Sequence, residues 1–213
     1  MTIKKLGHCC LLIKHDNLTI LTDPGTYSTA QDDVTGIDVV LITHEHVDHF
    51  HVESLKKVLA HNPDARVITN SGVGSKLDEA GISYTPLEGR STETVNNVLI
   101  EAFDHKHEEI FKEIGQVQNT GYFIGEKLFY PGDAFCNPEK EVDVLALPVA
   151  GPWCKTLAAI QYALELKPKK AFPVHDGMLQ KERIGSFHKT PEKVLLENGI
   201  QFLTMCEGDE KEF

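Results

Sequence analysis

The chain has 213 residues, of which 41% are hydrophobic and 25% charged, and its formal net charge is -11 at pH 7. This composition is ordinary for a soluble globular protein, and the length suits one domain over residues 1–213 that buries roughly 70% of its unfolded surface. Because an acidic surface repels phosphate backbones, the charge disfavours a nucleic-acid-binding protein, although a bound metal would still admit an anionic small substrate.

The termini and the cysteines suggest a compartment. No basic segment followed by an apolar segment opens the chain, and no apolar run reaches about 18 residues. The five cysteines form no Cys-x-x-Cys pair, which is typical of reduced thiols. We therefore expect a cytoplasmic protein that acts on a small molecule, with no membrane and no nucleic acid as partner. The sequence leaves the oligomeric state, including a homo-oligomer, open.

The first third of the chain is rich in predicted strands. Apolar and β-branched stretches bounded by turn residues predict strands over Thr2–Leu6, Cys9–Ile13, Leu18–Thr22, Ile37–Ile42 and Arg66–Thr69. Asp23-Pro24-Gly25 ends the third strand, because proline and glycine oppose its continuation. Helical spacing of apolar residues predicts helices over Val52–Ala60 and Gly74–Ala80, and Gly81 ends the second.

The rest of the chain alternates strands and helices. Strands are predicted over Val95–Phe103, Gly121–Ile124, Lys127–Tyr130, Val142–Val149, Lys170–Val174 and Ile200–Met205. Gly125-Glu126 between the second and third of these indicates a hairpin. We expect helices over Leu157–Leu166 and Pro191–Glu197, and we expect the charged tail Glu207–Glu212 to fray.

The strand Ile37–Ile42 runs directly into a histidine-rich segment, Thr43-His44-Glu45-His46-Val47-Asp48-His49. His44 and His46 are two residues apart and can point the same way, while Asp48 and His49 follow on the turn. Neutral imidazoles and a carboxylate are ligands that suit zinc, or iron and manganese at a harder site. The pattern would arise by chance about once in several hundred such chains. We interpret it as one half of a metal site.

Other predicted strands also end in potential ligands. His105 and His107 follow Val95–Phe103, Asp133 follows Lys127–Tyr130, and His175 follows Lys170–Val174. Ligands at strand ends share one rim, where rigid elements hold them and loops admit a substrate.

Together these motifs resemble those of the metallo-β-lactamase-fold hydrolases over nearly the whole chain. The nearest likeness is to small single-domain metal-dependent hydrolases whose N-terminal strand carries Gly-His, here Gly7-His8. The resemblance implies an α/β (α+β) fold, a four-layer αββα sandwich in which two mixed sheets lie face to face, helices cover both outer faces and the site lies at one edge. Periodicity alone would predict only a mixed α and β chain.

The resemblance also implies two divalent metal ions, with zinc foremost and manganese or iron as alternatives. One metal would be held by three histidines, namely His44, His46 and His107. The other would be held by Asp48, His49 and His175, with Asp133 between the two. The surrounding sequence favours His107 over His105 as the ligand, which leaves His105 beside the site or in solvent.

Three further residues are expected to support this site, and one segment is a candidate to cover it. His8 would lie near the metals without binding them, and Asp23, at a strand end, would fix the tautomer of a ligand. Trp153, the single tryptophan, would form a wall of the pocket. The segment Glu108–Val117, with its apolar residues, would form either a flap over the site or an amphipathic helix packed on the core.

The implied activity is that of a metal-dependent hydrolase, in which a water activated by two metals attacks a small ester, lactone, amide or phosphodiester. Asp48 would also orient that water, as a catalytic residue. The alternative is an iron-dependent oxidoreductase on the same fold, similar to the sulfur dioxygenases. The diiron branch of such enzymes usually has glutamate at the position of His46, which counts against that branch. A mono-iron sulfur dioxygenase keeps the histidines, so only the identity of the metal excludes it. A binding protein with a dead site would require a lost ligand, and none is missing.

Overall fold

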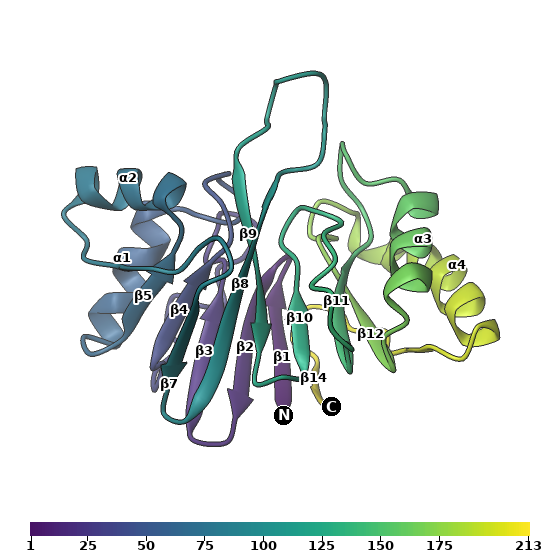
Figure 1. Ribbon diagram of the computed structural model, residues 1–213, viewed down its shortest axis with the longest axis horizontal. Coiled ribbons are helices and arrows are strands. Elements are labelled where there is room, and N and C mark those ends of the chain that lie inside the picture. The colour runs from purple at the N-terminus through teal and green to yellow at the C-terminus, as the bar shows by residue number, and fades with distance from the viewer.

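Two mixed β-sheets face each other between two pairs of helices in the computed structural model, which describes residues 1–213 (Figure 1). The first sheet has the strand order β14-β1-β2-β3-β4-β5-β6 and the second β13-β12-β11-β10-β9-β8-β7. The strands of the first sheet are β1 (Thr2–Gly7), β2 (Cys10–His15), β3 (Leu18–Thr22), β4 (Val39–Ile42), β5 (Arg66–Thr69), β6 (Thr85–Pro86) and β14 (Glu210–Glu212). Those of the second are β7 (Thr92–Val95), β8 (Val98–Lys106), β9 (Gln118–Ile124), β10 (Leu128–Tyr130), β11 (Val144–Pro148), β12 (Lys170–Val174) and β13 (Gln201–Phe202).

The helices cover the outer faces of the two sheets. Helices α1 (Val52–His61) and α2 (Ser71–Ala80) lie on one flank, and α3 (Thr156–Leu166) and α4 (Ile184–Glu197) on the other (Figure 1). A buried apolar cluster of 24 residues from both sheets fills the space between them. Two further clusters join the first sheet to α1 and α2 and the second sheet to α3 and α4. This four-layer α/β/β/α arrangement confirms the predicted fold class. No helix combines the length and the hydropathy needed to cross a bilayer.

The strand directions determine where the candidate ligands can meet. Strands β1 and β3 are both antiparallel to β2, and β4 runs parallel to β3. In the second sheet β8 and β10 are both antiparallel to β9, and β11 and β12 run parallel to β10. Because strands of the same direction end at the same edge of a sheet, the residues that follow β1, β3, β4, β8, β10 and β12 gather at one rim.

Two helices begin earlier than predicted. Helix α2 starts at Ser71, because the Asn70 side chain accepts a hydrogen bond from the Val73 backbone N–H and caps it. Helix α4 starts at Ile184, and Pro191, the predicted start, lies buried inside it. Proline favours the first turn of a helix, which explains the error. Packing of this residue overrides the local preference here.

Two strand predictions and the prediction of a frayed tail are also corrected. Val95 and Val98 lie on two antiparallel strands, because Asn96 and Asn97 both have positive φ and form a tight turn between β7 and β8. The tail does not fray throughout, since Glu210–Glu212 pairs with β1 and Phe213 is buried. The strand predicted over Ile200–Met205 is shorter in the structure and comprises only Gln201–Phe202.

Strands β8 and β9 are joined by residues 107–117, which we call the hairpin loop (Figure 1). It contains no helix and only an isolated bridge between Phe111 and Ile114. An amphipathic helix packed on the core is therefore the wrong interpretation of this segment. Phe111 and Ile114 are exposed.

Candidate metal centre

The histidine-rich segment begins where β4 ends at the rim. All four residues of β4 are buried between the parallel strands β3 and β5. The backbone then turns, and the N–H groups of His49 and Phe50 both donate to the His46 carbonyl. A Cβ atom on Gly25 would lie 2.0 Å from the Asp48 carbonyl oxygen. Only glycine, which has no Cβ atom, therefore lets the backbone at position 25 pack so closely against this turn.

The second sheet brings three more side chains to the same place. His107 follows β8, Asp133 follows β10 through Pro131-Gly132, and His175 follows β12. Gly132 has φ +64, and a Cβ there would meet the Asn119 amide, whose oxygen accepts the Asp133 N–H. The turn that places Asp133 thus depends on glycine and on one buried amide.

Asp133 lies in the middle of the cluster. Its Oδ2 is 2.8 Å from Nε2 of His175 and 3.3 Å from Nε2 of His107. Its Oδ1 is 3.2 Å from Nε2 of His49, but these two atoms are not aligned for a hydrogen bond. The carboxylate therefore touches histidines from both sheets.

Two groups of potential ligands flank this carboxylate. His44, His46 and His107 form one group, and His8, Asp48, His49 and His175 form the other. Within each group the ligand atoms all lie within 4.8 Å of one another. The predicted set His44, His46, Asp48, His49, His107, Asp133 and His175 is thus brought together in one cluster.

The two ring nitrogens of each buried histidine in the predicted ligand set have different roles, since Nδ1 makes a hydrogen bond and Nε2 is left free. Nδ1 of His49 is 2.7 Å from Oδ2 of Asp23, and Nδ1 of His44 is 3.0 Å from the Thr43 hydroxyl. Nδ1 of His107 donates to the Glu108 carbonyl, and that of His175 to the Ala150 carbonyl. With Nδ1 occupied, each ring presents Nε2 as the free nitrogen, the state in which imidazole binds a metal.

Several of these inward-facing atoms are buried and have no hydrogen-bond partner. They are Nε2 of His44, His49 and His175, together with Oδ1 of Asp133. Buried polar atoms are almost always paired. Three ring nitrogens and one carboxylate oxygen thus face one another without a partner, and a cation fits between them. The residues present therefore suit the binding of a divalent metal ion.

The electrostatics of the cluster also favour positive charge at its centre. Burial, followed by the charge on His49, lowers the pKa of His44 well below its usual value. Burial alone would lower the pKa of His49, but the carboxylates of Asp133 and Asp23 raise it well above. Burial would raise the pKa of Asp133, but His175 and His49 hold it well below. The directions of these shifts show that the buried carboxylates favour a positive charge beside them, as a bound metal ion would supply.

His8 and Asp48 form a hydrogen-bonded pair beside the second group. The Gly177 N–H donates to Nδ1 of His8, so Nε2 carries the proton and donates to Oδ2 of Asp48 at 3.2 Å. Burial lowers the pKa of His8 to about 4, although the bond to Asp48 opposes the shift. A neutral His8 whose Nε2 is protonated cannot offer that nitrogen to a metal.

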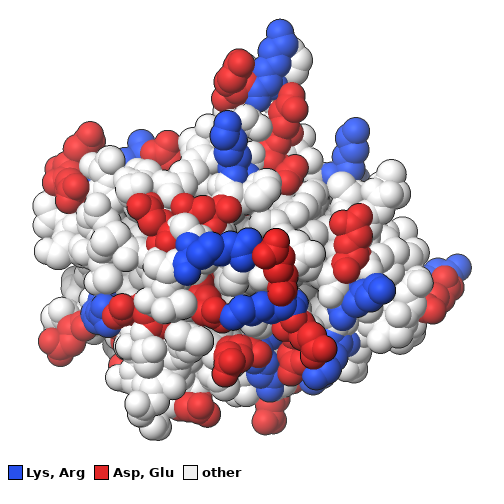
Figure 2. Space-filling model, viewed as in Figure 1, with Lys and Arg blue, Asp and Glu red and all other residues white.

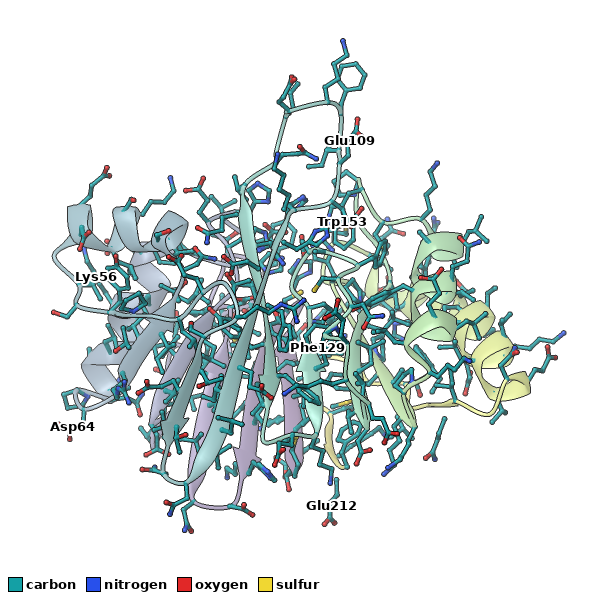
Figure 3. The ribbon with its side chains drawn as sticks, in the orientation of Figure 1. Lys56, Asp64, Glu109, Phe129, Trp153 and Glu212 are labelled. Carbon is teal, nitrogen blue, oxygen red and sulfur yellow. The ribbon has the colours of Figure 1, made fainter.

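Asp23 and Trp153 contact two of the candidate ligands. Besides His49, the Asp23 carboxylate accepts the Thr43 N–H at 2.8 Å and the Tyr130 hydroxyl. The indole Nε1–H of Trp153 donates to Oδ2 of Asp133 at 3.1 Å. Figure 3 labels Trp153, which is buried. Neither the Tyr130 bond nor the Trp153 bond can be read from the sequence, because each joins residues 20 or more positions apart.

His105 lies outside the cluster. It is still part of β8, paired with Asn119, and its exposed ring bonds the Lys106 carbonyl. Of the two places that the sequence left open for His105, beside the site or in solvent, the structure places it in solvent. Sequence reasoning also missed Cys9, whose sulfur lies close to His49 and Asp133. Burial raises the pKa of the Cys9 thiol to about 12, which disfavours a thiolate ligand.

Three residues at this rim have backbone angles that side chains rarely adopt. His8, Asp23 and His175 have φ of 46°, 39° and 62°. Each follows the end of a strand and turns the chain sharply. Such conformations cost free energy and persist where the surrounding structure enforces them, which is common at functional sites.

Comparison with known proteins finds a matching family, similar proteins and similar solved structures. The β-lactamase superfamily domain matches residues 2–175. Protein Rv0786c of Mycobacterium tuberculosis is 31% identical over 88% of this chain and 90% of its own length. The UPF0173 metal-dependent hydrolase MJ1163 of Methanocaldococcus jannaschii is 24% identical over 79% of this chain and 81% of its own. A crystal structure from Parabacteroides distasonis, assigned as a metal-dependent hydrolase, has a TM-score of 0.77 and 25% identity, covering 97% of this chain and 93% of that one.

Proposed function

Because the chain belongs to the β-lactamase superfamily and is a metal-dependent hydrolase of that superfamily, we propose that it uses two divalent metal ions, zinc foremost, to hydrolyse a small ester, lactone, amide or phosphodiester. The observation that carries this proposal is the set of buried, unpartnered ligand atoms on His44, His49, Asp133 and His175. None of these atoms has a hydrogen-bond partner, although Asp133 lies close to both His49 and His175.

The two groups of side chains suggest how the metals are shared. We propose that His44, His46 and His107 hold one ion, and that Asp48, His49 and His175 hold the other, with Asp133 between them. A bound pair of divalent ions would polarise the substrate oxygen and lower the pKa of a coordinated water towards neutrality.

Asp48 is the residue that we propose to orient the attacking water. Its carboxylate is partly exposed, with 18% of the side chain accessible, whereas Asp133 is buried. Burial would raise the pKa of Asp48, but the hydrogen bond from His8 and the charge on His49 hold it below its usual value. An ionised carboxylate that faces solvent beside the cluster can accept a proton from water and hold that water in place.

His8 and Trp153 are proposed to position the two carboxylates. His8 holds Asp48 and is itself oriented by the Gly177 N–H. Trp153 donates to Asp133 and lies with its ring 5.3 Å from that of His175. Both residues therefore fix the direction of an acidic ligand without occupying a ligand position.

The surface supports a small substrate over a polyanion. On the face shown in Figure 2, Lys and Arg side chains alternate with Asp and Glu, and no continuous basic patch appears. Nucleic-acid-binding surfaces are strongly positive.

Elemental analysis together with a labelled turnover tests the proposal. We expect about two divalent ions per chain in protein purified with metal supplied. A single turnover in oxygen-18 water should place solvent oxygen in the product, without dependence on dissolved oxygen. Protein that binds no metal would contradict the proposal. A single iron, with product oxygen drawn from O₂, would instead support the oxidoreductase alternative.

A further inference from the structure

Large exposed apolar side chains are concentrated around the candidate metal centre. Of the nine in the whole chain, six lie on the segments that surround it, namely Tyr27, Val47, Ile110, Phe111, Ile114 and Met178. A single exposed apolar residue is normal on a protein surface. A group of them that borders a functional site indicates a binding surface.

Contacts and shared cavities tie these side chains to the candidate ligands. Val47 lies between His46 and Asp48 in sequence and is 64% exposed. Ile110 lines a hollow of about 440 Å³ together with these three residues. On the other side of the cluster, the Tyr27 ring is 5.1 Å from that of His8.

The hairpin loop projects from the two sheets (Figure 1), and its two sides approach each other beside His46. A Cβ atom on Gly115 would lie 2.7 Å from Cδ1 of Ile110 and 3.8 Å from Cε1 of His46. The base of the loop is fixed, because the Glu108 N–H donates to the Asp133 carbonyl and the Glu108 carboxylate accepts the Phe135 N–H. Phe111 and Ile114 are thus held on a loop that starts at the metal centre.

Few cations face these hollows. The hollow beside His46 contains one, Lys76, which is paired with Glu45 at 3.3 Å. The hollow that Tyr27 and Met178 line has Glu207 as its single charged residue. An anionic substituent would therefore meet carboxylates and a single, paired cation, whereas an apolar substituent would bury the exposed side chains of Val47 and Ile110 on one side and of Tyr27 and Met178 on the other.

Resting on the proposed hydrolytic function, we propose that the substrate is an uncharged carboxylic ester, lactone or amide whose apolar acyl or aromatic group lies against the hairpin loop. Hydrolysis breaks the bond between the acyl carbon and the ester oxygen or amide nitrogen. The water oxygen enters the carboxylate product, one water proton leaves with the alcohol or amine, and the other passes to solvent. Because the two hollows offer a phosphate group a single, paired cation, we expect phosphodiesters to be the less favoured class.

The test is a series of p-nitrophenyl esters from acetate to hexanoate, with bis(p-nitrophenyl) phosphate alongside, on metal-replete protein. Each methylene that packs on the loop should raise kcat/KM about two- to fourfold. The triple variant Ile110→Ser, Phe111→Ser, Ile114→Ser should lower the hexanoate-to-acetate ratio of kcat/KM by about fivefold or more. The matched control Leu157→Ser, Leu196→Ser removes two exposed leucines of α3 and α4 and should leave that ratio unchanged.

Metal content and thermal unfolding of each variant show that the fold and the centre are intact. Turnover of esters with no dependence on chain length would overturn this inference and leave the hydrolase intact, whereas no turnover of any substrate would reject the proposed function itself. Faster cleavage of the phosphodiester than of hexanoate would also overturn it. So would a flat ester series in which the triple variant abolishes dimerisation or binding to phosphatidylcholine vesicles, since the surface would then serve a second copy or a membrane.

Discussion

The floor of the metal centre and the hairpin loop above it differ in what holds them. The floor consists of His44, His49, Asp133 and His175, which are at most 1% exposed and tied to their surroundings by hydrogen bonds from two sheets. On the loop, Phe111 and Ile114 are 61% and 66% exposed, and they interact with each other through one bridge.

This difference assigns the metal chemistry to the floor and the selectivity for substrates to the loop. A change in the floor leaves a charge or a ring nitrogen buried without its partner, so each side chain there depends on the others. A change on the exposed part of the loop disturbs no core packing. The loop can therefore vary with the substrate while the floor keeps the same metal chemistry.

The sharpest test of the floor is Asp133→Asn, which keeps the volume of the side chain and removes its charge. Because this carboxylate contacts histidines of both groups, we expect loss of bound metal and a fall in kcat/KM of about a thousandfold or more. Metal analysis and steady-state kinetics measure the two effects. The control Asp143→Asn changes a carboxylate paired with Lys169 on the surface. Equal effects of the two substitutions would show that the floor has no special role.

Asp23→Asn tests whether residues beneath the ligands matter. An amide in place of the carboxylate can donate to Nδ1 of His49, which would move the ring proton to Nε2 and block ligation. We expect metal affinity to fall by about 10- to 100-fold, measured by competition with a chelator. Asp38→Asn is the matched control, because Asp38 accepts the Thr19 N–H far from the centre. An unchanged affinity for Asp23→Asn would argue against the tautomer role.

Trp153→Phe removes one donor from Asp133 and keeps an aromatic ring at the wall. Because a hydrogen bond to a charged group is lost, we expect kcat/KM to fall about tenfold with the metals retained. Tyr162→Phe is the comparison, since that hydroxyl donates to the Cys136 carbonyl and touches no ligand. A larger effect from Tyr162→Phe would show that packing, and not the bond to Asp133, determines the activity.

The smallest effect concerns the pH dependence of stability in the metal-free protein. Burial lowers the pKa of His8 to about 4, below the value of about 6.5 expected in the unfolded chain. Between these pH values the unfolded chain binds one more proton at His8 than the folded chain does. The free energy of unfolding therefore rises with pH, and this contribution to stability is lost as the pH falls. The slope from this group is at most about 1.4 kcal/mol per pH unit. Urea unfolding from pH 4 to 7 should show a shallower rise in the free energy of unfolding for His8→Gln than for the unchanged protein. Identical slopes for the two proteins would contradict this role of His8.

The sequence predicted the part of the centre that is local. His44, His46, Asp48 and His49 lie within six consecutive positions after an apolar strand, so a strand end and one turn suffice to bring them together. The fold class also followed from the motifs through their resemblance to a known family. The order of strands and helices was largely recovered as well, because apolar periodicity reports burial directly.

Other features depended on pairing between distant segments. The positions of His105 and His107 depend on the register of β8 on β9, which keeps His105 in the strand and exposed while His107 lies in the cluster. The order of the tail came from its pairing with β1, and Pro191 lies buried inside α4 although proline favours the first turn of a helix. No local preference encodes these outcomes.

By itself, then, the sequence determined which residue types could bind a metal and which strand ends carried them, since both depend on neighbours along the chain. Tertiary structure alone decided that Asp133 lies among histidines of two sheets, that Tyr130 and Trp153 bond the carboxylates, and that the exposed apolar residues border the same cluster. The physical reason is that these contacts arise from two sheets packing face to face, and packing acts between residues that the sequence keeps far apart.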